Sequence, residues 1–87
     1  MIVTLAEAKS YLRVDFSDDD NFITGAISTG EKLVVDTLRK DLTDTPLNKV
    51  AVLYSVAYLY EHREDADMAE LSKSLRYILS TEREAAF

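Results

Sequence analysis

Residues 46–63 (PLNKVAVLYSVAYLYEHR) constrain the fold of this chain more than any other stretch, because they predict a helix that is apolar on every side. Thr45 is suited to cap its N-terminus, and Pro46 fits the first helical position, where a missing backbone N–H costs nothing. No glycine or further proline interrupts the helix. Three stripes at helical spacing leave no face for water: Leu47, Ala51, Tyr54 and Tyr58; Val50, Leu53, Ala57 and Tyr60; and Val52, Val56 and Leu59.

A helix that is apolar all round lies in a large core, crosses a membrane or is covered by partners. The apolar run from Val50 to Tyr60 is about half of the roughly 20 residues that a membrane span needs, which disfavours a membrane role. A chain of 87 residues is one domain, and at this size only about 60 to 65% of the unfolded chain's surface can be buried on folding. We therefore expect this helix to supply a small core and to need a partner for the rest of its surface.

Further helices are expected around this central one, giving an all-α fold: a small bundle of about four helices in a single domain over residues 1–87. Thr4 and Glu7 form a capping box, so a first helix begins after Thr4 and ends near Leu12 or Arg13. Asp67 with Glu70 repeats the capping pattern before a last helix of about four turns, whose apolar face is Met68, Leu71, Leu75, Ile78 and Leu79. For residues 82–87 the sequence leaves two alternatives, a continued helix or a free tail.

A long second helix is predicted from Asp18 to about Lys40, with Ser17 as its N-cap and residues 18–20 as solvated negative charge at the positive end of its dipole. Gly25 and Gly30 each cost up to about 1 kcal/mol inside a helix. They are expected to mark a close approach to the central helix, with Ala57 opposite Gly30. The alternative is a break near Gly30 that leaves two shorter helices.

The charge of the chain is acidic, with a formal net charge of −6 and a pI near 4.6. Proteins that grip nucleic acid over a wide surface use Lys and Arg to displace counterions from the phosphates, and this balance argues against that role. An acidic wall repels a duplex instead, which suits a surface that DNA must slide past. The triple aspartate at residues 18–20 lacks the alternate spacing, the glycine and the final glutamate of a calcium loop.

The sequence offers little material for catalysis, so the chain is not expected to be an enzyme. His62 is the sole histidine and falls in a charged turn without a Ser or Cys arrangement that it could activate. There is no cysteine, and no glycine-rich phosphate loop follows a strand. We predict no catalytic, cofactor-binding or metal-binding residues. Tyr54, Tyr58 and Tyr60 are interpreted as core or interface residues, because no basic residue interleaves with them as in a surface that stacks single strands.

Five segments of the chain carry a resemblance to a known family. They are residues 3–15 (VTLAEAKSYLRVD), 17–20 (SDDD), 46–47 (PL), 51–54 (AVLY) and 60–64 (YEHRE). Together they resemble the small head-tail connector proteins of tailed phages, which are sometimes labelled phage DNA-packaging proteins. The first segment is the most specific part, and the resemblance spans most of the chain.

The resemblance implies a structural virion protein of a tailed phage or prophage, made in the bacterial host cytoplasm and located at the head-tail junction. It implies a homo-oligomeric ring beneath the portal protein, a dodecamer in the virion, that continues the DNA channel and presents a platform to a tail-completion or stopper protein. DNA would pass through this channel without specific binding, and no membrane or cofactor is involved.

An alternative compatible with the same residues is a small cytosolic helical adaptor or an antitoxin-like binding module, whose apolar surface one different protein would cover. The N-terminus has no basic segment followed by an apolar one, so we expect no secretion signal and a cytosolic origin. The two alternatives differ in stoichiometry. A ring subunit associates with copies of itself, whereas an adaptor stays small until its partner binds.

Overall fold

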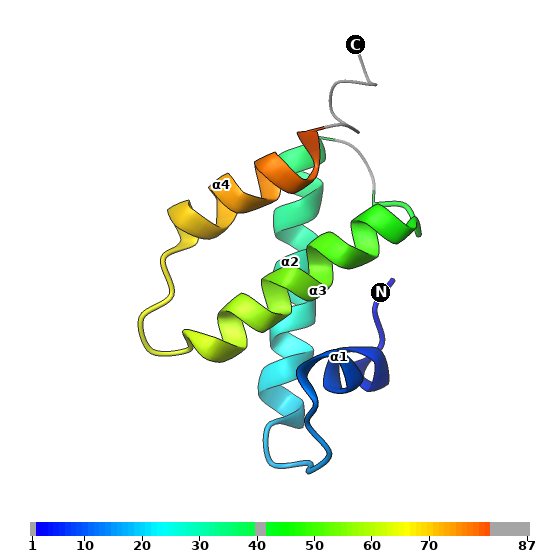
Figure 1. The fold of residues 1–87 in the computed structure, drawn as a ribbon, viewed down its shortest axis with the longest axis vertical. Helices are drawn as coiled ribbons and strands as arrows, with labels where there is room; N and C mark the ends of the chain where they lie inside the picture. Colours follow the sequence, from blue (N-terminus) through cyan, green and yellow to red (C-terminus); the bar gives the residue numbers. More distant parts are fainter. Residues whose placement is uncertain (1, 40–41, 81–87) are drawn as a thin grey trace.

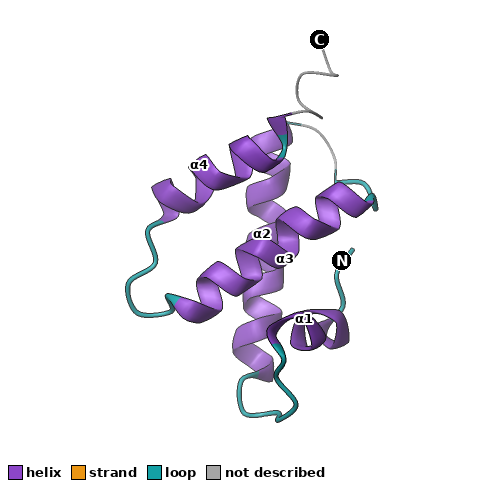
Figure 2. Ribbon diagram, viewed as in Figure 1, coloured by secondary structure: helices purple, strands orange, loops and turns teal. Residues whose placement is uncertain are grey.

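The computed structural model describes residues 2–39 and 42–80, and these form four helices and no strand (Figures 1 and 2). The helices are α1 (Leu5–Leu12), α2 (Asp20–Leu38), α3 (Pro46–Glu61) and α4 (Met68–Ile78). α2 contacts the other three helices, and its most extensive contact is with α3, which crosses it (Figure 1). The predicted all-α fold of about four helices is confirmed. The predictions for residues 82–87 lie outside the described residues.

Three helix starts follow the capping signals of the sequence. The Thr4 hydroxyl accepts the Glu7 N–H at 3.1 Å, and the Glu7 carboxylate accepts the Thr4 N–H at 3.0 Å, so the capping box is complete. Thr45 caps α3 by accepting the Asn48 N–H at 3.2 Å, with Pro46 in the first turn. The Asp67 carboxylate accepts the N–H groups of the second and third residues after it, at 3.1 and 3.2 Å. Each bond satisfies a donor that the first helical turn leaves free.

The second helix differs from its prediction at both ends. α2 begins at Asp20 rather than Asp18, and the expected Ser17 cap is wrong, since Asp19 occupies the N-cap position without a side-chain cap bond. α2 ends at Leu38, where Arg39 takes a left-handed conformation with φ of 59°. The helix is continuous through Gly30, so the alternative of two shorter helices is wrong. The central helix α3 ends at Glu61, two residues before the predicted end.

The contact between α2 and α3 is closest at Gly30. A Cβ atom built on Gly30 would lie 3.0 Å from the Ser55 Cβ and 3.4 Å from the Val52 carbonyl oxygen. The predicted close approach is therefore confirmed at Gly30, but the residue opposite is Ser55 and not Ala57, which is half-buried. A Cβ on Gly25 would meet nothing within 4 Å, so the expectation for that glycine is wrong.

The four helices share one core, and only one side of α3 faces that core. The buried apolar residues are Val3, Ala8, Val14, Ile23, Ala26, Ile27, Val34, Leu38, Ala51, Val52, Val56, Leu71, Leu75 and Leu79. On the outward side of α3, Val50 is 53% exposed and Tyr54 is 37% exposed. The molecule measures 17 Å across its thinnest dimension, which corresponds to about two layers of helices. Residues 2–39 and 42–80 therefore leave part of the apolar surface of α3 uncovered.

Candidate assembly surfaces

A groove runs along the outward side of α3 between α1 and α4. We call it the tyrosine groove. It is lined by Tyr11 of α1, by Tyr54, Ala57, Tyr58, Glu61 and His62 at α3 and its end, and by Glu70 and Ser74 of α4. Tyr11 is 52% exposed and also lines a neighbouring depression with Leu53 and Ala6, so the apolar floor continues over α1. Glu61 and Glu70 give the groove an acidic rim.

Tyr58 joins the end of α3 to the start of α4 within this groove. Its hydroxyl accepts the Asp67 N–H at 3.0 Å and donates to the Asp67 carbonyl oxygen at 3.3 Å. The Tyr58 ring lies 4.5 Å from the His62 ring, centre to centre. The Nδ1 atom of His62 is 3.6 Å from a carboxylate oxygen of Asp65, whose side chain is largely exposed. His62 thus sits in a surface turn against an aromatic ring and a solvated carboxylate.

A second apolar surface lies on the opposite side of the α3 and α4 helices. We call it the glycine groove. It is lined by Asn21, Phe22, Gly25, Ala26 and Thr29 of α2, with Leu59 of α3 and Met68 of α4. Residues two apart in a helix differ by about 200° around its axis. Leu59 therefore points roughly away from Ala57, and Met68 roughly away from Glu70. The two grooves therefore lie on opposite sides of the α3 and α4 helices.

A cluster around Asp19 ties the start of α2 to the end of α3. The Asp19 carboxylate accepts the Tyr60 hydroxyl at 2.8 Å and two Arg63 guanidinium N–H groups at 3.1 and 3.3 Å. The same guanidinium lies over the rings of Phe22 and Tyr60, 4.7 and 4.8 Å from their centres. The prediction that residues 18–20 are a solvated helix start is therefore wrong for Asp19. It is also wrong for Asp20, whose carboxylate is 2.7 Å from the Lys9 Nζ.

The charge of this cluster predicts how stability responds to acid. Hydrogen bonds from Arg63, and then from Tyr60, hold the pKa of Asp19 below its usual value. A carboxyl whose folded pKa is lowered stabilises the fold above its unfolded pKa, about 3.9, and this contribution is lost as pH falls through the folded pKa. We expect Asp19→Asn to lower the melting temperature at pH 7 and to lower it much less at pH 2. Circular dichroism melts of both proteins across this range measure the difference. An equal difference at both pH values would mean that packing, not charge, makes Asp19 important.

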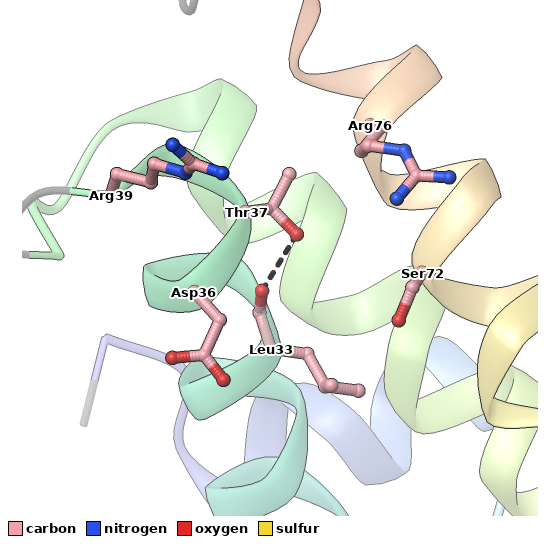
Figure 3. A pocket seen from close by; sticks show the side chains of 6 residues that line it. All are labelled: Leu33, Asp36, Thr37, Arg39, Ser72 and Arg76. Atoms are coloured by element: carbon pink, nitrogen blue, oxygen red, sulfur yellow. Dashed lines mark hydrogen bonds between the residues drawn. The ribbon is translucent and has the colours of Figure 1, made fainter.

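A third groove, between the end of α2 and α4, is polar (Figure 3). Its lining residues are Leu33, Asp36, Thr37, Arg39, Ser72 and Arg76. The Thr37 hydroxyl donates to the Leu33 carbonyl oxygen at 2.8 Å. Asp36 is 3.8 Å from the Lys32 Nζ in the same helix, a contact between two well-exposed side chains that contributes little. The lining of this groove contains two arginines and one aspartate.

Residues 2–39 and 42–80 contain no group of three or more His, Asp or Glu side chains arranged to hold a metal ion. Among the helices described, none is both long and apolar enough to cross a membrane.

The sequence identified only part of these surfaces. It marked three tyrosines of α3 as core or interface residues, and the structure places Tyr54 and Tyr58 in the tyrosine groove and Tyr60 in the Asp19 cluster. The sequence did not identify Tyr11 as a residue of the tyrosine groove or Phe22 as a residue of the glycine groove. Both have the helical spacing of residues that face the core, so the pattern does not show that they are exposed. The sequence signal for the glycine groove was Gly25, a glycine inside a predicted helix, but it was interpreted as a contact with the central helix.

Comparison with known proteins identifies the family. The family model described as "Phage gp6-like head-tail connector protein" matches residues 2–84, nearly the whole chain. No curated protein and no solved structure gave a match. The matched region contains the four described helices and both grooves. The family is the one that the five sequence segments resemble. The chain belongs to the phage gp6-like head-tail connector family.

Proposed function

We propose that this chain is a structural subunit of a tailed phage or prophage virion that assembles side by side with its copies into a ring under the portal protein. The observation that carries the proposal is a pair of grooves on opposite sides of the α3 and α4 helices: the tyrosine groove, with an acidic rim, and the apolar glycine groove. A contact between two different surfaces of the same protein repeats from copy to copy, and it forms a ring where the rotation closes. Membership of the connector family supports this arrangement.

The ring, with twelve copies, would continue the DNA channel between the portal protein and a tail-completion or stopper protein. The net charge of −6 supports this role, because an acidic channel wall does not retain the phosphate backbone of the passing duplex. The role needs no catalytic group, metal or cofactor. The site of action would be the head-tail junction of the virion, and the site of synthesis the cytoplasm of the bacterial host.

Light scattering over a wide concentration range, combined with negative-stain electron microscopy, tests the proposal. We expect a discrete large species whose share rises with concentration, and we expect it to appear as closed rings with a central opening. A strict monomer at every concentration would contradict self-assembly of the purified protein. It would favour the alternative of a helical adaptor, which one different protein covers.

A further inference from the structure

We propose that the ring contact seats the tyrosine groove of one copy on the glycine groove of the next copy, with the neighbour's Tyr54 packing over Gly25. This pairing rests on the proposed function, because it specifies which two surfaces meet in the ring. The molecule that occupies each groove is a second copy of this chain.

Gly25 gives the first argument. A glycine inside a helix is less favourable than alanine by about 1 kcal/mol, so its presence calls for a structural reason. Gly30 has such a reason, because a Cβ there would press against Ser55 and the Val52 carbonyl. Gly25 has none among the described residues 2–39 and 42–80, since a Cβ there meets nothing of theirs within 4 Å. It instead forms the floor of an exposed groove between Phe22, Leu59 and Met68. Missing side-chain volume at such a place leaves room for a bulky group from another molecule.

The positions of the two grooves give the second argument. Because they lie on opposite sides of the α3 and α4 helices, one symmetric contact between two copies cannot cover both of them. A head-to-tail contact covers both grooves on every subunit. The exposed aromatic residues fit this arrangement. Tyr54 and Tyr11, exposed by 37% and 52%, are the bulky groups of one groove, while Gly25 and Ala26 are the small residues of the other.

Charge complementarity favours a second copy over an unrelated protein. The tyrosine groove has Glu61 and Glu70 at its rim, and both side chains are exposed. Beside the glycine groove, the Arg63 guanidinium lies 4.7 Å from the centre of the Phe22 ring, and its side chain remains 40% exposed. Two N–H groups of this guanidinium already bond Asp19 of the same copy. In the proposed pairing the acidic rim of the next copy approaches the remaining N–H donors of Arg63. Rim charges of this kind fix register and suppress wrong partners.

Cysteine cross-linking tests the pairing directly, because the chain has no cysteine of its own. Gly25→Cys places a thiol in the glycine groove, where a Cβ has free space, and Ala57→Cys places one in the tyrosine groove. Each single variant alone is expected to give no covalent dimer under oxidation or with a short bis-maleimide. An equal mixture of the two should give a covalent dimer, and the double variant should give a ladder of multimers.

The other outcomes separate this pairing from the proposed function. Rings that form in the microscope while the mixture stays uncross-linked would overturn the pairing and leave the ring intact. A covalent dimer of Ala57→Cys alone would show a symmetric contact and would also overturn it. A protein that remains monomeric in every measurement would overturn the ring and the pairing together.

A substitution that fills the glycine groove provides an independent test of the proposed pairing. Gly25→Gln should fold with an unchanged or higher melting temperature, because glutamine favours the helix and no neighbour obstructs its Cβ. The concentration needed for assembly should nevertheless rise at least tenfold. Thr24→Gln, at an exposed neighbouring position in α2 outside the lining of this groove, is the matched control and should assemble like the parent protein. Normal assembly of Gly25→Gln would overturn the pairing.

Discussion

Replacement of Val56 by aspartate is expected to unfold the isolated subunit. Val56 is fully buried on the side of α3 that faces the core, among apolar side chains. An aspartate there would either bury an unpaired charge or take up a proton, and both options cost several kcal/mol. Small domains are stable by only about 5 to 15 kcal/mol in total, so the loss approaches the whole stability of the fold. Far-ultraviolet circular dichroism should show a largely unfolded protein at 25 °C.

Val50→Asp is the matched control, since it makes the same change in the same helix. Val50 is 53% exposed on the outward side of α3, so its aspartate can stay hydrated. The change in the free energy of unfolding should stay within about 0.5 kcal/mol, as for surface substitutions in general. If the two variants melted at the same temperature, the orientation of α3 about its own axis would have to be different from the one described.

Gly30→Leu is expected to destabilise the fold by about 3 kcal/mol, the upper end of the usual range for overpacking. The first atom of the new side chain would already lie 3.0 Å from the Ser55 Cβ, with the Val52 carbonyl oxygen 3.4 Å away. The carbonyl belongs to the backbone of α3 and cannot rotate aside, so the two helices must separate. The intrinsic gain of replacing glycine in a helix, about 1 kcal/mol, offsets only part of this cost. Chemical denaturation measures the change.

Gly25→Leu tests whether the effect at Gly30 comes from contact rather than from the loss of glycine. It changes the same residue type in the same helix, at a position where a Cβ meets nothing within 4 Å. The monomer should be as stable as the parent protein or more stable by up to about 1 kcal/mol. Comparable destabilisation by both substitutions would contradict the different surroundings of the two glycines.

The sequence was a good guide wherever structure depends on near neighbours in the chain. The starts of α1, α3 and α4 could be predicted because Thr4, Thr45 and Asp67 bond to N–H groups two or three residues away. The start of α2 could not, because its aspartate takes part in a contact across the fold. Asp19 lies more than 40 residues from Tyr60 and Arg63, and their hydrogen bonds replace the local cap.

The sequence predicted that α3 needs a partner, but it did not predict which residues form the surfaces that a partner would contact. The periodicity of α3 is almost equal on all sides, so it cannot tell which side faces α2. In the structure, two buried polar residues lie on the side of α3 that faces the rest of the fold. Asn48 is buried with its amide donating to the Thr43 carbonyl and hydroxyl oxygens, at 2.9 and 3.1 Å, and Ser55 is buried against Gly30. The buried side of α3 combines these two residues with Ala51, Val52 and Val56, while the larger Tyr54 lies on the outward side, so hydrophobic patterning does not distinguish the two sides.

In the proposed ring assembly, the slender build of the subunit, 17 Å across its thinnest dimension, would affect how long unassembled copies survive in a host cell. Neighbours that bind only the folded form stabilise it by mass action, by about 2.7 kcal/mol when their concentration is a hundred times the dissociation constant. A copy that has not met a neighbour would lack this gain, so it would open more often and be exposed to host proteases. Proteolysis would then remove surplus subunits while those in completed rings persist, and the supply of connector would adjust to the number of sites available.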